Sequence, residues 1–466
     1  MARGRKKETL TPEERLQAAL VPESEQPYTV PRNWCWTQLG TYIDFATDYV
    51  ANGSFASLKQ NVACYKEENY AILVKTQDFS NSFTEDLTYT DKCGYDFLKK
   101  SVLYGGELIL SNIGSIGKVF RVPHLNKPMT LAPNSIMIKC YRETDYDLLY
   151  YYFLSPFGTE QLYSITTGTA VKKFNKTDLK TICLPLPPLS EQQRIVDRIE
   201  SLFAKLDEAK QKAQDALDSF ETRKAAILHK AFTGELTAQW RKEHGVGMES
   251  WDNTTLSKIV IGFKYGTSEK SDYSYKGMPV FRIPNITDDG LSFEDLKFLS
   301  HKDISDENQI HENDILIVRS NGSRELVGKS VLVPQLDREY AYASFLIRIQ
   351  PLESVVPNYL VMYLNSTDAR MQMFKKAKSS AGINNINSKE LGAILINLPS
   401  FSEQAEIVRI LDNLLAKEQL AKEAAEGVLE QIDLIKKAIL ARAFRGELGT
   451  NDPGEESAVE LLKQVL

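Results

Sequence analysis

The sequence has few cysteines and histidines and no long apolar run. Its five cysteines are scattered through the first 183 residues without a C-x-x-C pair, and its five histidines are equally dispersed. This pattern argues against a zinc site and against a disulfide framework. No apolar run reaches the ~18 residues that cross a bilayer, and no apolar segment follows the basic residues 1–7, as it would in a secretory signal. We therefore expect a cytoplasmic protein that contacts no membrane.

Signatures of catalysis are also missing. The sequence contains no H-E-x-x-H, no G-x-S-x-G and no Asn/Asp-Pro-Pro-aromatic tetrapeptide of an adenine methyltransferase. Residues 322–330 nearly spell a phosphate-binding loop, but five residues instead of four separate the glycines, and two predicted strands flank the segment. We expect a chain that has no catalytic residue, metal ion or cofactor of its own.

The sequence also lacks an excess of basic charge. The net charge of −6 argues against a protein that coats DNA through bulk charge. Residues 34–189 contain 15 basic and 15 acidic side chains, residues 249–401 contain 17 and 19, and residues 402–466 contain 8 and 13. Most of the acidity therefore lies at the C-terminus, and the two longer segments are near neutral and can still carry local basic clusters.

What the sequence does contain is an internal repeat. The triplet that begins at Ser190 recurs at Ser402, and at this offset 21 of the 47 positions over residues 190–236 are identical without a gap. Weaker similarity extends upstream, where residues 148–152 match 360–364 and residues 167–179 match 379–391. Identity of this extent indicates a duplication.

Each copy of the repeat is predicted to be one long helix. Residues 190–232 contain neither proline nor glycine, Ser190 is a suitable N-cap, and Gly234 and Gly446 are suitable stops. About 43 residues make a rod of roughly 60 Å. We expect the two rods to pack on each other and to run antiparallel, while the alternative is that each packs on its own domain. The apolar positions follow heptads in two lines per copy: Ile195, Leu202, Ala209, Ala216 with Ile199, Leu206, Ala213, Phe220, Ile227, and Ile407, Leu414, Ala421, Val428, Ile435 with Leu411, Ala425, Ile432, Ile439.

The expected organisation alternates domains and rods in an α+β chain with an internal pseudo-two-fold repeat. The segments are an N-terminal arm (1–33), domain 1 (34–188), a central helical spacer (189–248), domain 2 (249–401), a distal helical spacer (402–449) and a tail (450–466). Both domains are predicted to mix helices and strands. The predicted strands are residues 70–74, 108–110, 118–122, 136–139, 280–283, 315–318, 329–333 and 345–349.

These segments resemble the specificity (S) subunit family of Type I restriction-modification systems from about residue 27 to about residue 449. The rods carry the resemblance through LPLPPLSEQQRIVDRIESLF, KAAILHKAFTGEL and the degenerate copies LPSFSEQAEIVRILDNLL and KKAILARAFRGEL. The domains carry it through PYTVPRNWCWTQLG, GELILSNIGSIGKV, TGTAVKKFNKTDL and NDILIVRSNGSRELVGKSV. The second rod departs from the pattern at its entry, where Pro399, Ser400 and Phe401 replace the Pro-Pro-Leu of the first.

The resemblance implies a non-catalytic subunit that binds double-stranded DNA, with each target-recognition domain reading one half of a split, asymmetric target. It implies that the rods set the spacing of the two halves and dock methyltransferase subunits. The implied partners are two methyltransferase (M) subunits and two restriction/motor (R) subunits, which would use S-adenosylmethionine, ATP and Mg²⁺. A duplicated reader on a pseudo-two-fold frame also suits two half-sites on physical grounds.

Three groups of residues are candidates for DNA contact, because lysine suits phosphates, asparagine suits adenine and arginine suits guanine. The alternative for each group is a solvated loop or a tight turn. The first is the basic and polar loop that closes each domain, with Lys172, Lys173, Lys176, Lys378, Asn384 and Asn385. The second is the glycine-containing loop, with Asn112, Ser115, Lys118, Arg319, Asn321, Ser323, Arg324 and Lys329. The third follows early strands, with Lys75, Gln77, Tyr265, Thr267, Ser268, Arg282 and Asn285.

Two other functions remain open at this point. One is a standalone endonuclease with a fused recognition region, which would cleave DNA with Mg²⁺ alone. The other is a coiled-coil scaffold that binds no DNA, which would show no site preference in any complex. The divergence of the two domains outside their shared closing segments favours two different readers on one frame.

Overall fold

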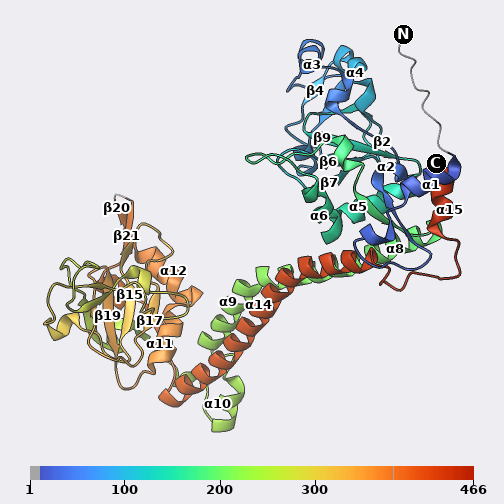
Figure 1. Ribbon diagram of the computed structural model, residues 1–466. Coiled ribbons are helices and arrows are strands. Elements are labelled where there is room, and N and C mark those ends of the chain that lie inside the picture. The colour runs from blue at the N-terminus through green and yellow to red at the C-terminus, as the bar shows by residue number, and fades with distance from the viewer. Residues whose placement is uncertain (1–10, 381) are drawn as a thin grey trace. The chain divides into compact units, whose positions relative to one another are not determined.

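The computed structural model describes residues 11–380 and 382–466 and divides the chain into two compact units. Unit 1 comprises Met1–Lys212 and Val428–Leu466, and unit 2 comprises Ala213–Gly427. Residues 1–10 of the expected N-terminal arm and Ala381 lie outside the described residues. Each unit contains one mixed domain and part of each rod (Figure 1). The domain boundaries drawn from the sequence stay a prediction.

The domain of unit 1 is built on two four-stranded sheets. The first has the order β2-β9-β6-β7 and is antiparallel throughout. The second has the order β4-β3-β8-β5, in which β3 and β8 are parallel. All four residues of β3 and of β6 are buried, as expected for strands covered on both faces. The strands are Cys35–Gln38 (β1), Ile43–Asp48 (β2), Ala71–Val74 (β3), Tyr89–Thr90 (β4), Val102–Leu103 (β5), Leu108–Ser111 (β6), Val119–Arg121 (β7), Met129–Leu131 (β8), Ser135–Cys140 (β9) and Cys183–Leu186 (β10).

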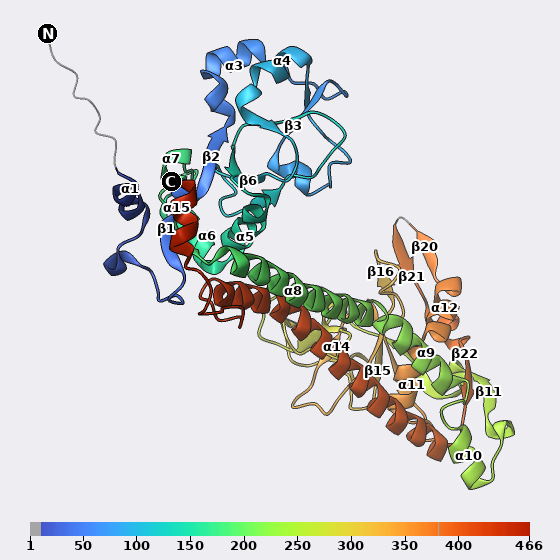
Figure 2. The ribbon, with the colours of Figure 1, turned by 90° about the vertical axis from the view of Figure 1, so that its right-hand side faces the viewer.

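The helices of unit 1 cover these sheets and begin the rod. In Figure 2, α5 and α6 lie between the first sheet and α8, whereas α3 and α4 lie at the far end of the domain from α8. Strands β1 and β10 pair beside the start of α8 and bring the two ends of the domain together. The helices are Pro12–Ala19 (α1), Leu39–Tyr42 (α2), Phe55–Asn61 (α3), Lys92–Phe97 (α4), Glu143–Leu154 (α5), Pro156–Ser164 (α6), Lys176–Leu179 (α7), Leu189–Asp218 (α8) and Ala458–Val465 (α15).

Unit 2 repeats this architecture. Its first sheet has the order β12-β19-β15-β17, which matches β2-β9-β6-β7 strand for strand, and its second has the order β14-β13-β18. A short pair, β11 and β22, again closes the domain beside the rod. The strands are Asp252–Thr255 (β11), Val260–Tyr265 (β12), Pro279–Phe281 (β13), Lys297–Phe298 (β14), Ile315–Val318 (β15), Ser320–Asn321 (β16), Ser330–Leu332 (β17), Ala341–Tyr342 (β18), Leu346–Pro351 (β19), Lys378–Ser380 (β20), Ile383–Asn385 (β21) and Leu395–Leu398 (β22).

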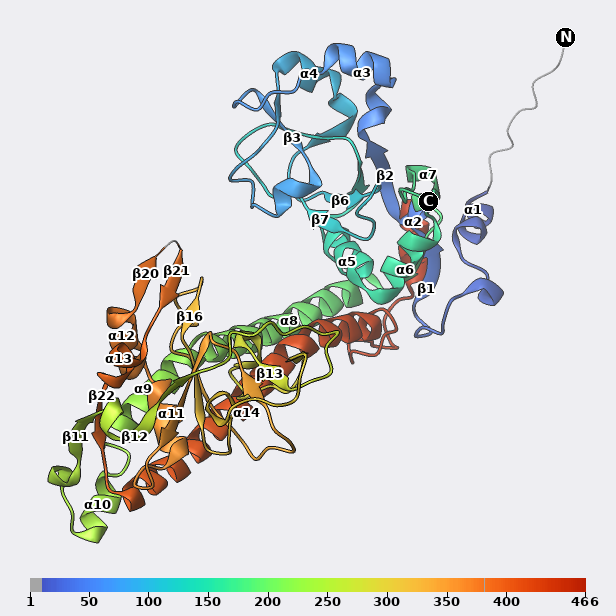
Figure 3. The same ribbon diagram turned by 90° about the vertical axis from the view of Figure 1, so that its left-hand side faces the viewer.

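Helices α11, α12 and α13 close the domain of unit 2 in the same order as α5, α6 and α7 close that of unit 1, whereas α3 and α4 have no helical counterpart among the described residues of unit 2. Helices α11 and α12 cover the first sheet (Figure 3), and they are followed by the β20–β21 hairpin. The helices are Phe220–Phe232 (α9), Ala238–His244 (α10), Pro357–Leu364 (α11), Thr367–Lys376 (α12), Ser388–Gly392 (α13) and Phe401–Ala443 (α14). The predicted α+β class with an internal repeat is confirmed, because the two domains share sheet order, strand order and closing helices.

The two rods run antiparallel within each unit. In unit 1 the Asp207 carboxylate of α8 accepts a hydrogen bond of 2.6 Å from the Lys436 ammonium of α14. In unit 2 the Arg223 guanidinium donates to the Glu418 carboxylate at 2.8 Å, where the sequence showed an interruption of the apolar seam. The charged pair therefore fills the interruption, and the expected antiparallel packing of the rods is confirmed.

Two details of the predicted rods are corrected. The first rod is not one continuous helix but breaks at Ser219, between α8 and α9. The Ser219 hydroxyl donates to the Asp215 carbonyl and also accepts a hydrogen bond from Arg223, so side chains compete with the helix backbone there. In the second rod, the predicted seam positions Val428 and Ile435 are each 41% exposed, because only one of the two heptad lines faces the partner helix along this stretch.

The predicted strands are all present, but several begin one residue later or end one or two residues earlier than predicted. Residues 280–283 were expected to form one strand, but β13 ends at Phe281 and Ile283 begins a short 3-10 turn. Pro284 cannot donate the backbone hydrogen bond that a ladder needs, which accounts for the early end. Within the described part of the chain, no helix is both long and apolar enough to cross a membrane.

The tail and the described part of the arm belong to the core of unit 1. Ala458, Leu461 and Leu462 of α15 are buried in the same cluster as Trp34 and Leu39. The Ala458 amide donates to the Asn33 carbonyl at 2.8 Å. Helix α15 therefore packs on the entrance of the first domain, which the sequence did not indicate.

Candidate nucleic-acid interface

In unit 1, the structure brings the glycine-containing loop and the basic loop together. Ile113 and Lys173 form an isolated antiparallel bridge, and the Gly114 amide donates to the Lys172 carbonyl at 3.1 Å. Lys172 and Lys173 are both exposed. The two loops are about 60 residues apart in the sequence, yet they form one continuous surface that carries free lysines.

In unit 2, the corresponding loops form a small sheet of order β16-β21-β20, which Figure 3 shows projecting beside α12. Ser320 pairs with Asn385 and Asn321 pairs with Asn384. The Asn384 side-chain amide also donates to the Gly322 carbonyl at 3.0 Å. The first and second candidate groups therefore lie side by side in both units.

Part of the third group joins the same surface. In unit 2 the guanidinium carbon of Arg319 lies 4.6 Å from the centroid of the Tyr265 ring. In unit 1, Asp48 ends β2 as Tyr265 ends β12, and its carboxylate accepts from the Lys176 ammonium at 3.1 Å. The ends of two equivalent strands thus support the two closing loops.

Several predicted contact residues are exposed, and the structure gives their side-chain ends no ion pair among the described residues. They are available to an approaching ligand without the breaking of an internal bond. Exposed loop residues of this kind suit phosphate contacts when they are lysines, and water-mediated or base contacts when they are polar. They are Gln77, Ser115, Lys118, Lys172, Lys173, Ser268 and Ser323.

Other predicted residues are engaged inside the protein. The Lys75 ammonium donates to Thr88 (2.7 Å), Asn112 to the Phe174 carbonyl (3.0 Å), and Arg324 to the Phe374 carbonyl (2.7 Å). Three cations face carboxylates: Arg282 faces Asp295 (3.2 Å), Lys329 faces Asp288 (2.7 Å) and Lys378 faces Glu390 (3.6 Å). The ion pairs compete with any phosphate that approaches these cations. Hydrogen bonding to Lys329 lowers the pKa of Asp288, and hydrogen bonding to Tyr273 lowers that of Asp295, with Arg282 adding to the effect.

Asn285 and Thr267 lie inside their domain. Asn285 is 1% exposed, and its side-chain amide donates to the carbonyls of Ser292 and Glu294. The Thr267 hydroxyl is buried and accepts from the Glu269 amide at 3.1 Å. Both side chains shape the loops around the candidate surface and do not present their polar atoms on it.

Some predicted contact residues carry buried polar atoms without a hydrogen-bond partner. They are the side-chain oxygen of Asn112 in unit 1 and, in unit 2, the Nε atoms of Arg282 and Arg319 and the side-chain oxygen of Asn385. Other such atoms among the described residues, for example those of Thr90 and Ser135, belong to residues outside the candidate groups. Buried polar groups are normally paired, so each exception is a place that water or a ligand can complete.

Sequence reasoning missed Asp78, Asp48 and Phe345. Asp78 caps the turn after β3, where its carboxylate accepts from the Lys75 amide at 2.8 Å, and burial raises its pKa. Phe345 is 57% exposed at the start of β19, directly beside Arg319. The carboxylate three residues after Lys75 is a detectable cap signal, whereas nothing in the sequence distinguishes Phe345 from a core residue.

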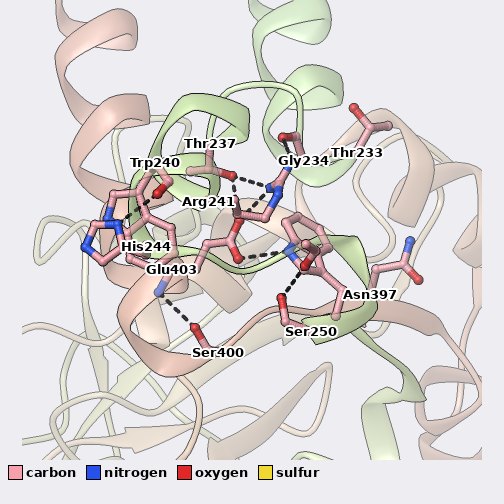
Figure 4. Close-up of polar contacts among 12 residues, drawn as sticks. Thr233, Gly234, Thr237, Trp240, Arg241, His244, Ser250, Asn397, Ser400 and Glu403 are labelled. Carbon is pink, nitrogen blue, oxygen red and sulfur yellow. Dashed lines mark hydrogen bonds and ion pairs between the residues drawn. The ribbon is translucent and has the colours of Figure 1, made fainter.

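The junction between each rod and its domain is a second polar cluster. The Trp34 indole donates to the Glu191 carboxylate at 2.7 Å, and the Trp251 indole donates to the Glu403 carboxylate at 3.0 Å. In unit 2 the Arg241 guanidinium also donates to Glu403 at 2.6 Å (Figure 4). The repeated Ser-Glu-Gln triplets thus attach the rods to the domains and do not contribute to the candidate DNA surface.

The described residues contain no group of three or more His, Cys, Asp or Glu side chains that could hold a metal ion. The chemistry that the arrangement offers is recognition: loops at the ends of sheet strands carry exposed lysines beside half-buried asparagines and arginine, and they occur once in each unit. This is the architecture of a protein with two recognition modules.

Comparison with known proteins identifies the family. The model of the Type I restriction modification DNA specificity domain matches twice, at residues 51–217 and 248–430. These two ranges cover most of the chain and correspond to its two repeats. The chain belongs to the family of Type I restriction-modification specificity subunits, as the sequence resemblance indicated.

Curated relatives carry the same description. The chain is 26% identical over 429 residues to the Type I restriction enzyme EcoKI specificity subunit of Escherichia coli K12, covering 87% of this chain and 90% of that protein. It is 23% identical over 425 residues to the StySPI specificity subunit of Salmonella potsdam, with the same coverage of both chains.

Solved structures show the same fold. The HsdS subunit of Thermoanaerobacter tengcongensis is matched with a TM-score of 0.64 at 20% identity, over 91% of this chain and all of that one. A chain from a study of complex assembly and conformational transition of the Type I restriction-modification system is matched with a TM-score of 0.61, also at 20% identity, over 90% of this chain and all of that one.

Proposed function

We propose that this chain is the DNA-recognition subunit of a Type I restriction-modification complex and that each domain reads one half of a bipartite, asymmetric target. The observation that carries the proposal is the pair of equivalent surfaces, one per unit, in which the glycine-containing loop and the closing loop are hydrogen-bonded together. The side chains on the two surfaces differ, with Lys172 and Lys173 in unit 1 where Asn384 and Asn385 stand in unit 2. Different side chains at equivalent places favour different bases in the two halves.

Catalysis and cofactors belong, in this proposal, to partner proteins. Two methyltransferase subunits would dock on the rods and use S-adenosylmethionine, and two restriction/motor subunits would use ATP and Mg²⁺. The chain itself would bind duplex DNA and hold no cofactor. The rods would set the number of unspecified base pairs between the two halves, because their length fixes how far apart two attached readers can lie.

The test is an exchange of one domain in the assembled complex. Residues 249–401 are replaced by the equivalent segment of another family member, and the chain is expressed with its methyltransferase partner in cells that lack other adenine methylation. Modification-sensitive sequencing should show that one half of the methylated motif changes while the other half is retained. An unchanged motif, or the absence of any preferred motif with the unaltered chain, would contradict the proposed function.

A further inference from the structure

We propose that Arg319 is the residue of the second domain that reads a guanine directly, with its guanidinium held against the ring of Tyr265. The inference rests on the proposed function, and it names one base and one side chain within the second half-site.

The backbone of Arg319 is fixed on both sides. Its amide donates to the Phe345 carbonyl at 2.9 Å, and its carbonyl accepts from the Ile386 amide at 3.0 Å. The first bond comes from the start of β19 and the second from the end of the β20–β21 hairpin. Two backbone hydrogen bonds hold the Cα atom of Arg319 in one position. The side chain therefore starts from a fixed point, as a residue that reads a base requires.

The side chain of Arg319 is oriented as well. Its guanidinium carbon lies 4.6 Å from the Tyr265 ring centroid, and one terminal nitrogen lies 3.5 Å from the Ser344 carbonyl oxygen. The Tyr265 oxygen accepts from the Ser388 amide at 3.0 Å, which holds the ring in turn. A planar guanidinium that packs on an aromatic ring loses little further freedom when it forms a bidentate contact.

Unlike Arg282 and Lys329 of the same domain, Arg319 has no acidic partner among the described residues. Among the described residues, no carboxylate lies within ion-pairing distance of Arg319, whereas Arg282 faces Asp295. The Nε atom of Arg319 is buried without an acceptor, and the side-chain oxygen of Asn385, on the adjoining β21, is buried without a donor. The terminal nitrogens of Arg319, one of which has only the 3.5 Å contact with the Ser344 carbonyl, are left to pair with the O6 and N7 acceptors that guanine presents in the major groove.

The equivalent position in the first domain carries different chemistry. Asn112 makes the same two backbone bonds, from its amide to the Asn134 carbonyl (3.3 Å) and from the Phe174 amide to its carbonyl (3.1 Å). Its side-chain amide nitrogen is already bound to the Phe174 carbonyl. One shared position thus holds a planar cation in one unit and an amide in the other, and only the former offers two parallel donors to a guanine.

The alternative role for Arg319 is a phosphate contact, and the two roles predict different measurements. A guanine contact acts at one base pair, whereas a phosphate contact lowers affinity uniformly across sequences and reduces the salt dependence of binding. The experiment uses the full chain in complex with its methyltransferase partner. The probes are duplexes that carry the methylated motif, in which each base pair of the second half-site is replaced in turn at two salt concentrations.

Arg319→Lys and Arg319→Gln should lose about 5- to 150-fold of the discrimination at one G·C pair, the equivalent of a bidentate contact, and should leave the first half-site unchanged. The matched control is Arg338→Gln, since Arg338 is an arginine of the same domain whose guanidinium packs over Tyr340 at 5.3 Å but lies outside the candidate surface. This control should bind and discriminate like the unaltered complex.

The inference is overturned if the Arg319 variants discriminate normally at every base pair, or if they bind all duplexes more weakly with a smaller salt slope. Thermal unfolding of each complex is measured alongside, and Arg319→Lys, which preserves charge and most of the volume, supplies the result if Arg319→Gln does not fold. Failure of the proposed function is distinguishable, because it would appear in the unaltered complex as the lack of any preferred site.

Discussion

The glutamates of the two Ser-Glu-Gln triplets are buried carboxylates whose main contacts are with the entrance of each domain. Glu191 and Glu403 are both 0% exposed, and each accepts a hydrogen bond from a tryptophan indole. The following residues, Gln192 and Gln404, each donate to a proline carbonyl five positions earlier. The identity of the triplets is therefore explained by one junction that is built twice.

The two junctions differ in how they stabilise the buried charge. The Glu403 carboxylate accepts hydrogen bonds from the Arg241 guanidinium at 2.6 Å and from the Thr237 hydroxyl at 2.7 Å. Both donors belong to the segment that follows the first rod. The Glu191 carboxylate accepts hydrogen bonds from the Thr450 hydroxyl at 3.1 Å and from the Asn451 side-chain amide at 2.8 Å. Both donors belong to the segment that follows the second rod. Among the described residues, the buried ion pair belongs to the junction of unit 2, since neither donor from the tail to Glu191 is charged.

Glu403→Ala should lower the free energy of unfolding by about 3–5 kcal/mol, because it leaves the Arg241 guanidinium buried without its partner. The matched control is Glu406→Ala, three residues along the same helix, whose partner Arg409 is 70% exposed. That change should cost about 0–1 kcal/mol. Urea denaturation followed by tryptophan fluorescence measures both, and equal effects would show that the ion pair with Arg241 does not stabilise the junction.

At the scale of secondary-structure elements, helix α15 makes the C-terminal segment part of the core of unit 1. Its apolar residues Ala458, Leu461 and Leu462 are buried against the first domain. Upstream of the helix, Arg194 of α8 donates to both oxygens of Glu455, at 2.8 and 2.7 Å, and to the Thr450 carbonyl. The tail is thus a structural part of unit 1, comparable to the segment with α10 that follows the first rod in unit 2.

Leu462→Ala should destabilise unit 1 by about 2–5 kcal/mol, the usual cost of removing a buried leucine side chain. Leu462 is 0% exposed, whereas Leu466, four residues later, is 37% exposed and supplies the control Leu466→Ala. We expect the control to change stability by less than about 1 kcal/mol. Thermal unfolding of the two variants tests this, and similar melting temperatures would mean that α15 does not contribute to the core.

At the scale of the whole molecule, duplication explains the arrangement of sheets, helices and loops in both units. The sheet order β2-β9-β6-β7 recurs as β12-β19-β15-β17, and each closing loop meets its glycine-containing loop. The two rods are identical at 21 of 47 aligned positions, while the loops of the two domains differ in length and side chains. A constant frame with two divergent domains is the arrangement that the proposed recognition of two different half-sites requires.

Adding one heptad to each rod should lengthen the unspecified spacer of the target. Seven residues inserted after Lys212 and seven after Gly427 extend both rods by about 10.5 Å, which corresponds to up to about three base pairs at about 3.4 Å each. Modification-sensitive sequencing of the variant should show both half-sites unchanged and a longer gap. A heptad in only one rod serves as the control, because it misaligns the antiparallel pairing and should abolish methylation; an unchanged spacer in the double variant would mean that the rods do not set it.

Prediction from sequence succeeded where local pattern and covalent order decide the outcome. The rods, their antiparallel packing and strands such as β15 at Ile315–Val318 follow from heptads, helix stops and short apolar runs. It was less complete where a side chain competes with the backbone. The break at Ser219 and the early end of β13 depend on hydrogen bonds and on a proline that hydrophobic periodicity does not describe.

The sequence by itself determined that this chain is a duplicated α+β protein with two rods and which family it belongs to, because identity at a constant offset survives independently of folding. Only the tertiary structure decided which candidate residues stand together. Asn285 and Arg282 have polar side chains of the kind that reads DNA, yet one is buried on backbone carbonyls and the other faces Asp295. Arg319 stands apart because Tyr265, Phe345 and Ile386 converge on it from distant parts of the chain. Contacts between residues far apart in sequence arise from packing, and for that reason no local pattern in the sequence could indicate them.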